Sequence, residues 1–466
     1  MATQNQKFPN NPQIEVIKSS KTGLFTNYIF KAIPLAFDES LSYYECLCGL
    51  LNYLKNVIIP TVNNNADAVT ELQTLYEELR SYVKNYFDNL DVQEEINNKL
   101  DEMVEEGTIQ KIIADYLNSK AIFGFDTVSS MKNATNLING SYAQTLGYYN
   151  KNDGGYALYK IRNITNEDII DEMFIIALNN NLIAELIHNN NINTKQIGIN
   201  EDVDETNKLK NALNKIDNIT ICEGNYIFNN IELKDNKCIK NKGTIKSSLN
   251  DALFLLTDGN NIKIDGGIYL GDNQTQTQSL IKCSNIINCE FKNLTLKNAL
   301  NKCIDISGNS KNNIIENISV SDCLSSSGAG ISLSGADVQN NKLNNINAYN
   351  NRIGITLNGC HHNLLSNIYC ENNVEMGITV DGIITDSNDG GTYNQFNNIT
   401  ILGTSSTNYG GIYLGNKSSY NSFENIVIKN CNNAGIRQTH SENESNAYGN
   451  TFNNIIIINC SYGIIW

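Results

Sequence analysis

A short pattern built on an asparagine followed by an aliphatic residue recurs seven times in the last third of the chain. Six of the seven copies are preceded by Asn-x-apolar-x, as in Asn363-Leu-Leu-Ser-Asn367-Ile. Subtracting successive anchor numbers gives steps of 24, 28, 22, 31, 27 and 29 residues. Self-similarity with a shortest step near 22 residues predicts a solenoid whose extra residues lie in loops. The anchors are Asn293, Asn317, Asn345, Asn367, Asn398, Asn425 and Asn454.

A second phrase, Gly-apolar-x-apolar, lies between successive anchors. Both phrases alternate apolar and polar residues with a period of two, which predicts strands that bury one face. Short strands in turns of this length predict a mostly β fold, a right-handed parallel β-helix over residues 191–466 filled by stacked aliphatic side chains. Corner asparagines should bond their own backbone and the asparagine of the next rung. A leucine-rich repeat is the alternative solenoid, and its Leu-x-x-Leu-x-Leu signature is absent from the sequence. The phrase begins at Gly330, Gly354, Gly377 and Gly411, and the pairs Gly435-Ile436 and Gly463-Ile464 continue the series.

Charge and hydropathy exclude several kinds of partner. The net charge of −15 and the isoelectric point of about 4.8 disfavour nucleic acid. No apolar run approaches the ~18 residues of a membrane span. The first residues, Met1 to Asn11, are polar and contain no signal-peptide core. The sequence therefore predicts synthesis in a cytoplasm, without a membrane span.

The twelve cysteines do not form a metal-binding pattern. Ten of them fall in the β-helix at or beside strand positions, and the closest spacing elsewhere is Cys46-Leu-Cys48. We expect reduced, buried thiols that pack as small apolar groups. The pair His361-His362 has no acidic or thiol partner at metal-ligand spacing, and no cofactor fingerprint is present. Neither a metal nor a cofactor is predicted.

The N-terminal part is organised differently. All four prolines lie in the first sixty residues. A heptad pattern from Val69 to Tyr86 predicts an oligomerisation helix, with an ordinary amphipathic helix as the alternative. A further helix should follow Asp91 and end at Gly107. We divide this part into residues 1–60 (attachment segment), 61–120 (helical oligomerisation region) and 121–190 (small mixed adaptor), with a helix over 205–215 before the first rung near Ile219.

Three segments together resemble a known family. The segment from Tyr86 to Met103 resembles the N-terminal helical module of phage tail proteins from low-GC Gram-positive hosts, and Tyr142 to Gly155 resembles the adaptor that follows it. Residues 193–226 are similar to the start of the pectate-lyase-like β-helix of tailspikes. Ile199-Asn-Glu-Asp202 replaces the usual Gly/Ala-Gly-Asp-Gly loop, so the agreement there rests on the helix and on Glu223-Gly-Asn-Tyr226.

This resemblance implies a phage tail appendage, tailspike or tail fibre of the pre-neck appendage type. It implies a homotrimer that is assembled in the host bacterial cytoplasm and becomes part of the virion. The α-helical N-terminal region would attach to other tail or neck/portal proteins, and the β-helix would point toward the host. Related appendages bind cell-wall polysaccharide or teichoic acid, and some also cleave it.

Two long insertions at one corner of the β-helix mark the candidate site. They follow Ile378 and Ile436 and are rich in carboxylates, which could serve as acid and base in glycoside cleavage. The adjoining strands place Thr356, Thr379, Tyr413 and Arg437 in one outward column, where Tyr can stack on sugars and Arg can pair with anions. The alternative is an ordinary solvated loop. Candidate catalytic residues are Asp381, Asp386, Asp389 and Glu442, and candidate glycan-binding residues are Thr379, Tyr413, Arg437, Tyr420 and His440.

Three functions remain open at this point. The first is a structural appendage that adsorbs to host surface glycans, and the second is a polysaccharide depolymerase, hydrolase or lyase. The third is a spacer whose receptor-binding domain lies elsewhere. Because the sequence ends at Trp466 in phase with the repeat, we expect either trimer partners or a missing or cleaved distal domain to cover that end.

Overall fold

The computed structural model describes Thr74, Glu77, Glu78, Ser81 and residues 93–109, 111–112 and 121–465, except 248–251, 273–278, 383–389 and 439–446. The chain divides into two compact units. The first comprises residues 1–145 and 158–186, and the second comprises 146–157 and 187–466. Each unit is described separately.

The first unit contains the helix expected after Asp91. This helix, α6 (Gln93–Glu105), ends before Gly107, whose φ of 68° is the left-handed conformation common after helix ends. Most of the heptad pattern from Val69 to Tyr86 lies outside the described residues, so the oligomerisation region stays a prediction. No helix in the described part of the chain is long and apolar enough to span a membrane.

A five-stranded sheet and a short helix form the rest of the first unit. Thr127 caps the helix α8 (Val128–Lys132) and exchanges hydrogen bonds with Ser130 in a capping box. Arg162 on the third strand binds Asp168 at 2.6 Å and Glu185 at 2.7 Å, and these ion pairs tie neighbouring strands and a loop together. The sheet order is β1 (Ile122–Phe125), β2 (Tyr142–Thr145), β3 (Ala157–Asn163), β5 (Leu182–Leu186) and β4 (Ile175–Ala177).

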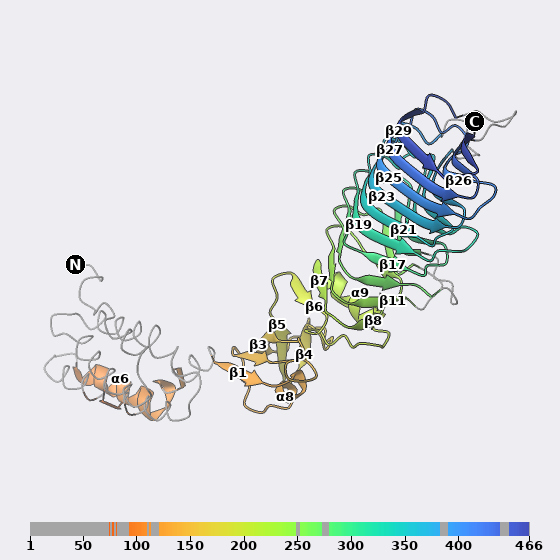
Figure 1. Ribbon diagram of the computed structural model, residues 1–466. Coiled ribbons are helices and arrows are strands. Elements are labelled where there is room, and N and C mark those ends of the chain that lie inside the picture. Colours follow the sequence, from red (N-terminus) through yellow and green to blue (C-terminus); the bar gives the residue numbers. More distant parts are fainter. Residues whose placement is uncertain are drawn as a thin grey trace, which may run out of the picture. The chain divides into compact units, whose positions relative to one another are not determined.

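The second unit is a coil of parallel strands, and the predicted parallel β-helix is therefore confirmed (Figure 1). A helix, α9 (Thr206–Lys215), precedes most of its rungs, close to the expected 205–215. Sheet 1 contains β6 (Asn191–Asn193), β7 (Asn218–Ile221), β8 (Asn225–Ile227), β10 (Cys238–Asn241), β11 (Thr244–Lys246), β13 (Lys263–Asp265), β14 (Ile268–Leu270), β16 (Glu290–Lys292), β17 (Thr295–Lys297), β19 (Ile314–Ser321), β21 (Lys342–Tyr349), β23 (Leu364–Asn373), β25 (Gln395–Thr404), β27 (Ser422–Cys431) and β29 (Thr451–Ile458). Sheet 2 contains β9 (Ile231–Glu232), β12 (Phe254–Thr257), β15 (Ser279–Ser284), β18 (Lys302–Ser307), β20 (Ala329–Ser334), β22 (Ile353–Asn358), β24 (Met376–Asp381), β26 (Gly410–Leu414), β28 (Ala434–Gln438) and β30 (Tyr462–Ile465).

The anchor asparagines mark a bend inside sheet 1. In an early rung the bend at Asn293 separates β16 from β17, whereas β19 and the later strands continue through it. All seven anchors have φ between 53° and 60°, a left-handed conformation that asparagine tolerates better than other side chains. Their amides also bond along the axis, for example from Asn317 to Asn293 at 3.0 Å and from Asn345 to Asn317 at 2.8 Å.

The leading asparagines of the pattern form a second, buried ladder. In each step the side-chain Nδ2 of one asparagine donates to the Oδ1 of the next, at 2.8 to 3.1 Å. The same Oδ1 also accepts the backbone N–H of the preceding asparagine, as Asn394 does from Asn363 at 2.9 Å. Corner amide groups are thereby satisfied without water. The ladder contains Asn313, Asn341, Asn363, Asn394, Asn421 and Asn450.

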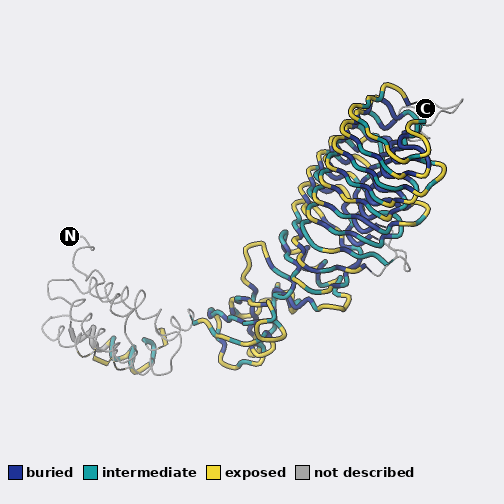
Figure 2. Tube along the Cα trace, viewed as in Figure 1, coloured by how far each residue is buried: buried dark blue, intermediate teal, exposed yellow. Residues whose placement is uncertain are grey.

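Apolar side chains fill the inside of the coil. Burial follows the alternation expected from the sequence, with buried residues inside and exposed residues at the corners (Figure 2). Phe396, Phe423 and Phe452 stack along the interior with ring centroids 4.5 and 5.0 Å apart. Seven of the ten cysteines in the described chain are buried, and burial raises the pKa of the Cys370 thiol to about 12. These thiols act as core residues.

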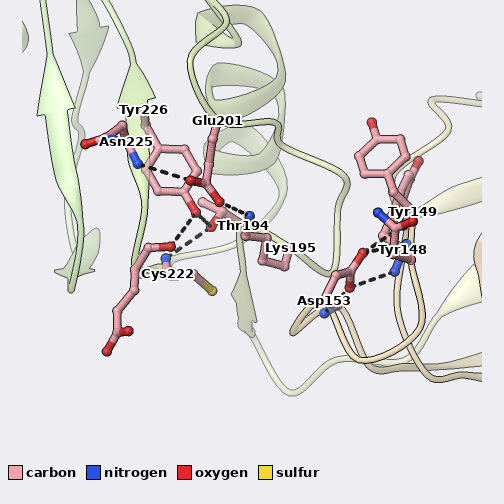
Figure 3. Close-up of polar contacts among 12 residues, drawn as sticks. Tyr148, Tyr149, Asp153, Thr194, Lys195, Glu201, Cys222, Asn225 and Tyr226 are labelled. Atoms are coloured by element: carbon pink, nitrogen blue, oxygen red, sulfur yellow. Dashed lines mark hydrogen bonds and ion pairs between the residues drawn. The ribbon is translucent and has the colours of Figure 1, made fainter.

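The loop 146–157 belongs to the β-helix unit and packs near its first rungs (Figure 3). Tyr149 donates its hydroxyl to the carbonyl of Gly198 at 2.9 Å. Lys195 and Glu201, on the segment that leads into the coil, form an ion pair at 2.5 Å. Glu201 lies against Gly224, where an added Cβ would come within 2.4 Å of the carboxylate carbon. Gly224 also has a φ of 135°, which L side chains rarely adopt, and this backbone conformation explains the glycine of the Glu-Gly-x-Tyr turn.

Asp153 organises this loop, and its protonation should affect stability. Its carboxylate accepts backbone N–H bonds from Tyr148, Tyr149, Asn150 and Gly155 at 2.8 to 3.1 Å. Burial alone would raise the pKa of Asp153, but these four bonds outweigh it and lower the pKa below its ordinary value. A lowered folded-state pKa stabilises the protein above the unfolded pKa, and that stabilisation is lost as the pH falls through the folded value.

We therefore expect Asp153→Asn to reduce the free energy of unfolding at pH 7, and the deficit to shrink as the pH falls below about 4. Urea denaturation of both proteins between pH 7 and pH 3 measures this. A deficit that stays constant over the whole range would show that the carboxylate charge does not contribute.

Candidate functional site

The outward column on sheet 2 has the register expected from the sequence. Thr356 pairs with Thr379, Thr379 with Tyr413, and Tyr413 with Arg437. The two threonines, however, are each only 6% exposed, so this end of the column is not an open surface. Outward alternation alone did not predict this burial.

The covered end of the column lies beside a small apolar cluster. Ala329, Ile353 and Met376 form this cluster, and the rings of Tyr409 and Tyr413 pack against it. Tyr409 and Tyr413 also contact each other edge to face, with centroids 5.4 Å apart. The Tyr413 ring is therefore engaged in packing within the chain.

Arg437 also makes a contact within the chain. Its Nη1 donates to the carbonyl of Asn408, in the loop that connects β25 to β26. Arg437 is half-buried as a residue, and this bond holds the loop near sheet 2. Thr379, Tyr413 and Arg437 thus lie together as predicted, but Thr379 is buried, and Tyr413 and Arg437 make contacts within the chain that a glycan would have to share.

Of the four candidate carboxylates, Asp381 lies in the described part of the chain. It ends β24 in register with Asn358, and its Oδ1 accepts the N–H of Gly382 at 2.8 Å. Its carboxylate lies over the next rung, because a Cβ on Gly415 would come within 2.2 Å of Oδ1. Asp386, Asp389, Glu442 and the glycan candidate His440 lie outside the described residues. An acid–base pair at this corner therefore stays a prediction.

A column of exposed aromatic side chains lies at the corner where these loops return to sheet 1. The rings of His362 and Tyr393 stack at 5.2 Å with an interplanar angle of 8°, and those of Tyr393 and Tyr420 stack at 5.2 Å and 7°. Tyr448 meets Tyr420 edge to face at 5.1 Å. Tyr393, Tyr420 and Tyr448 are 49%, 46% and 58% exposed. We call these four residues the aromatic column.

The backbone under the aromatic column has an unfavourable conformation. His362, Tyr393 and Tyr420 have φ values of 56°, 57° and 57°. In four earlier rungs the same corner position is asparagine, which tolerates this conformation. A bulky side chain there is an outlier, and such residues gather at binding and catalytic sites. The asparagines are Asn261, Asn288, Asn312 and Asn340, with φ between 56° and 60°.

The following rung is adapted to the column. Gly449 occupies the left-handed position with φ 68°, and a Cβ there would come within 2.6 Å of the Tyr420 ring. The aromatic ring of this rung instead comes from Tyr448, one residue earlier. Tyr448 is held by its backbone, which accepts the N–H of Tyr420 at 3.0 Å and donates to Ser419 Oγ at 3.1 Å.

Sequence reasoning identified Tyr420 but missed the rest of the column. A signal was present, because the residue before each leading asparagine changes from Asn in Asn340-Asn341 to His or Tyr in the next three rungs. Aligning the repeats on the leading asparagine shows this change. In the described chain, no group of three or more His, Cys, Asp or Glu side chains is arranged to hold a metal ion.

No family model and no curated protein matches this sequence. Several solved structures are similar to it, and they include phage tailspike proteins. The enzymatically active domain of tailspike protein 2 of bacteriophage CBA120 is 10% identical, with a TM-score of 0.40 over 73% of this chain and 61% of that one. A tailspike from Acinetobacter baumannii bacteriophage Fri1, a capsular polysaccharide depolymerase, is 14% identical, with a TM-score of 0.34 over 72% of this chain and 75% of that one. The chain thus spans less than two thirds of the first of these two structures.

Proposed function

We propose that this protein is a structural phage tail appendage that adsorbs to host cell-surface glycans through its β-helix. The observation that carries the proposal is the aromatic column. At Tyr393 and Tyr420, two successive rungs accept a costly backbone conformation to display large aromatic side chains to solvent. Folding gains little from this exposure, so a ligand explains it better than stability does.

The chemistry of these side chains suits sugars. A Tyr side chain combines an apolar ring with a hydroxyl that donates and accepts hydrogen bonds. A pyranose has both features, since C–H groups cover its faces and hydroxyls line its edge.

Assembly with other copies and attachment through the N-terminal region belong to the same proposal. They are supported by the resemblance of the segments Tyr86 to Met103 and Tyr142 to Gly155 to modules of phage tail proteins. The expected placement is in the virion tail, with the β-helix available to the host surface.

Wall binding and glycan cleavage are measured in one experiment. The full chain is incubated with purified walls of the host bacterium, and both bound protein and newly released reducing ends are quantified. We expect saturable binding without reducing-end release. Release of reducing ends would show that the protein is a depolymerase rather than a binding protein without activity. Unsaturated products would identify the depolymerase as a lyase. Absence of both would favour a spacer whose receptor-binding domain lies elsewhere.

A further inference from the structure

The surface next to the aromatic column carries a second set of aligned side chains. On the strands that leave this corner, register aligns Lys342, Leu364, Gln395, Ser422 and Thr451 in one row. The next outward row contains Asn344, Ser366, Asn397, Glu424 and Asn453. Most of these side chains are uncharged amides or hydroxyls. We call the two rows the amide surface.

We propose that the aromatic column and the amide surface together bind a neutral, hydroxyl-rich glycan chain that runs along the β-helix axis. This inference rests on the proposed function and specifies its ligand class. It concerns a site on the outside of the coil, separate from the carboxylates of the predicted acid–base pair.

Repetition along the axis favours a linear polymer. The ring centroids of the column are 5.2, 5.2 and 5.1 Å apart, close to the ~4.8 Å spacing of neighbouring strands. Each of these rungs therefore presents one aromatic ring at a nearly constant interval. A single sugar would contact one or two rungs, whereas a chain would contact them all.

Asn397, in the second row, retains hydrogen-bonding capacity for sugar hydroxyls. Asn397 is exposed, and its Oδ1 accepts from Asn425 Nδ2 at 3.2 Å. A side-chain amide offers two donors and two acceptor lone pairs, so this bond leaves further donors and acceptors on Asn397. Sugar hydroxyls also both donate and accept, so an amide surface matches them in either orientation.

Charge on this surface argues against a phosphate polymer. In the two rows that form the amide surface, the charged residues are Lys342 and Glu424, one of each sign. Phosphate recognition uses clustered Arg and Lys, which these rows lack. The chain as a whole carries −15, which repels a polyanion. The ligand class is therefore neutral polysaccharide rather than teichoic acid.

The test uses two kinds of host wall, intact walls and walls stripped of phosphodiester polymers by hydrofluoric acid. The wild type should bind both kinds of wall equally. Its affinity should be roughly constant between about 0.05 and 0.5 M NaCl, because rising salt screens charge interactions and binding to a neutral glycan does not depend on them. The double variant Tyr393→Asn/Tyr420→Asn should bind about tenfold more weakly or worse. Its melting temperature should equal or exceed that of the wild type, because asparagine suits the left-handed corner.

A matched control removes a tyrosine from another outward position. Tyr369→Thr copies its register neighbour Thr400 and should bind stripped walls like the wild type. Binding that requires phosphodiesters and disappears at high salt would overturn the inference and leave the proposed function standing. Unchanged binding of the double variant would also overturn it. If the wild type binds neither wall, the proposed function itself fails.

Discussion

Replacing Asn394 by Leu is expected to lower the free energy of unfolding by about 2–6 kcal/mol, because two buried donors would lose their acceptor at ~1–3 kcal/mol each. The two donors are the backbone N–H and the Nδ2 of Asn363, both bonded to Asn394 Oδ1 at 2.9 and 3.0 Å. The Asn394 amide also donates to the carbonyl of Cys360 at 2.9 Å, and that bond would be lost as well. Asn394 is fully buried, so water does not replace these partners.

Urea denaturation and amide hydrogen exchange measure this effect. In a solenoid each rung contacts mainly its neighbours, so we expect the loss of protection to be greatest in β23, β25 and β27. The control is Asn397→Ala, three residues further along in β25, an exposed position where a change within about 0.5 kcal/mol is expected. Equal stability of the Asn394→Leu protein and the wild type would show that the buried ladder contributes nothing.

Replacing Gly354 by Ala is expected to destabilise the coil by about 1–3 kcal/mol or more, through overpacking. An added Cβ would come within 2.4 Å of the carbonyl oxygen of Gly377 in the next rung and within 3.0 Å of Cys370 Sγ. The first of these atoms belongs to the backbone, so the clash is relieved only by moving a strand. Glycine at position 354 is therefore required for the close approach of the next rung.

The repeat supplies a matched control for this prediction. Gly463 begins the same phrase in the last rung, and an added Cβ there meets no atom within 4 Å. Gly463→Ala should leave the denaturation midpoint nearly unchanged while Gly354→Ala lowers it. Similar losses in both proteins would mean that backbone conformation, and not the approach of the next rung, selects glycine at this position.

The parallel β-helix could be predicted from the sequence because its information is local and repeated. Alternation with a period of two identifies the strands, and the anchor Asn317 and its six counterparts mark the bends. Since every rung stacks on a copy of itself, the register follows from aligning the repeats. This is why the pairing of Thr379, Tyr413 and Arg437 was predicted correctly.

Burial and exposure on the outside of the coil were less accessible to sequence reasoning. The threonines of the column look exposed by alternation, but they lie beside the apolar cluster on which Tyr413 packs. The aromatic column depends on stacking between residues 31 and 27 positions apart, as the numbers of His362, Tyr393 and Tyr420 show. Such contacts follow from the height of each rung and the length of each loop.

The sequence by itself determined the solenoid, its bends and its buried strand faces, because each of these depends on side chains a few residues apart. The tertiary structure decided which outer side chains are covered and which meet along the axis, as Tyr393 and Tyr420 do. Those outcomes depend on the stacking of rungs whose loops differ in length. They therefore cannot be predicted from the residue pattern within one repeat.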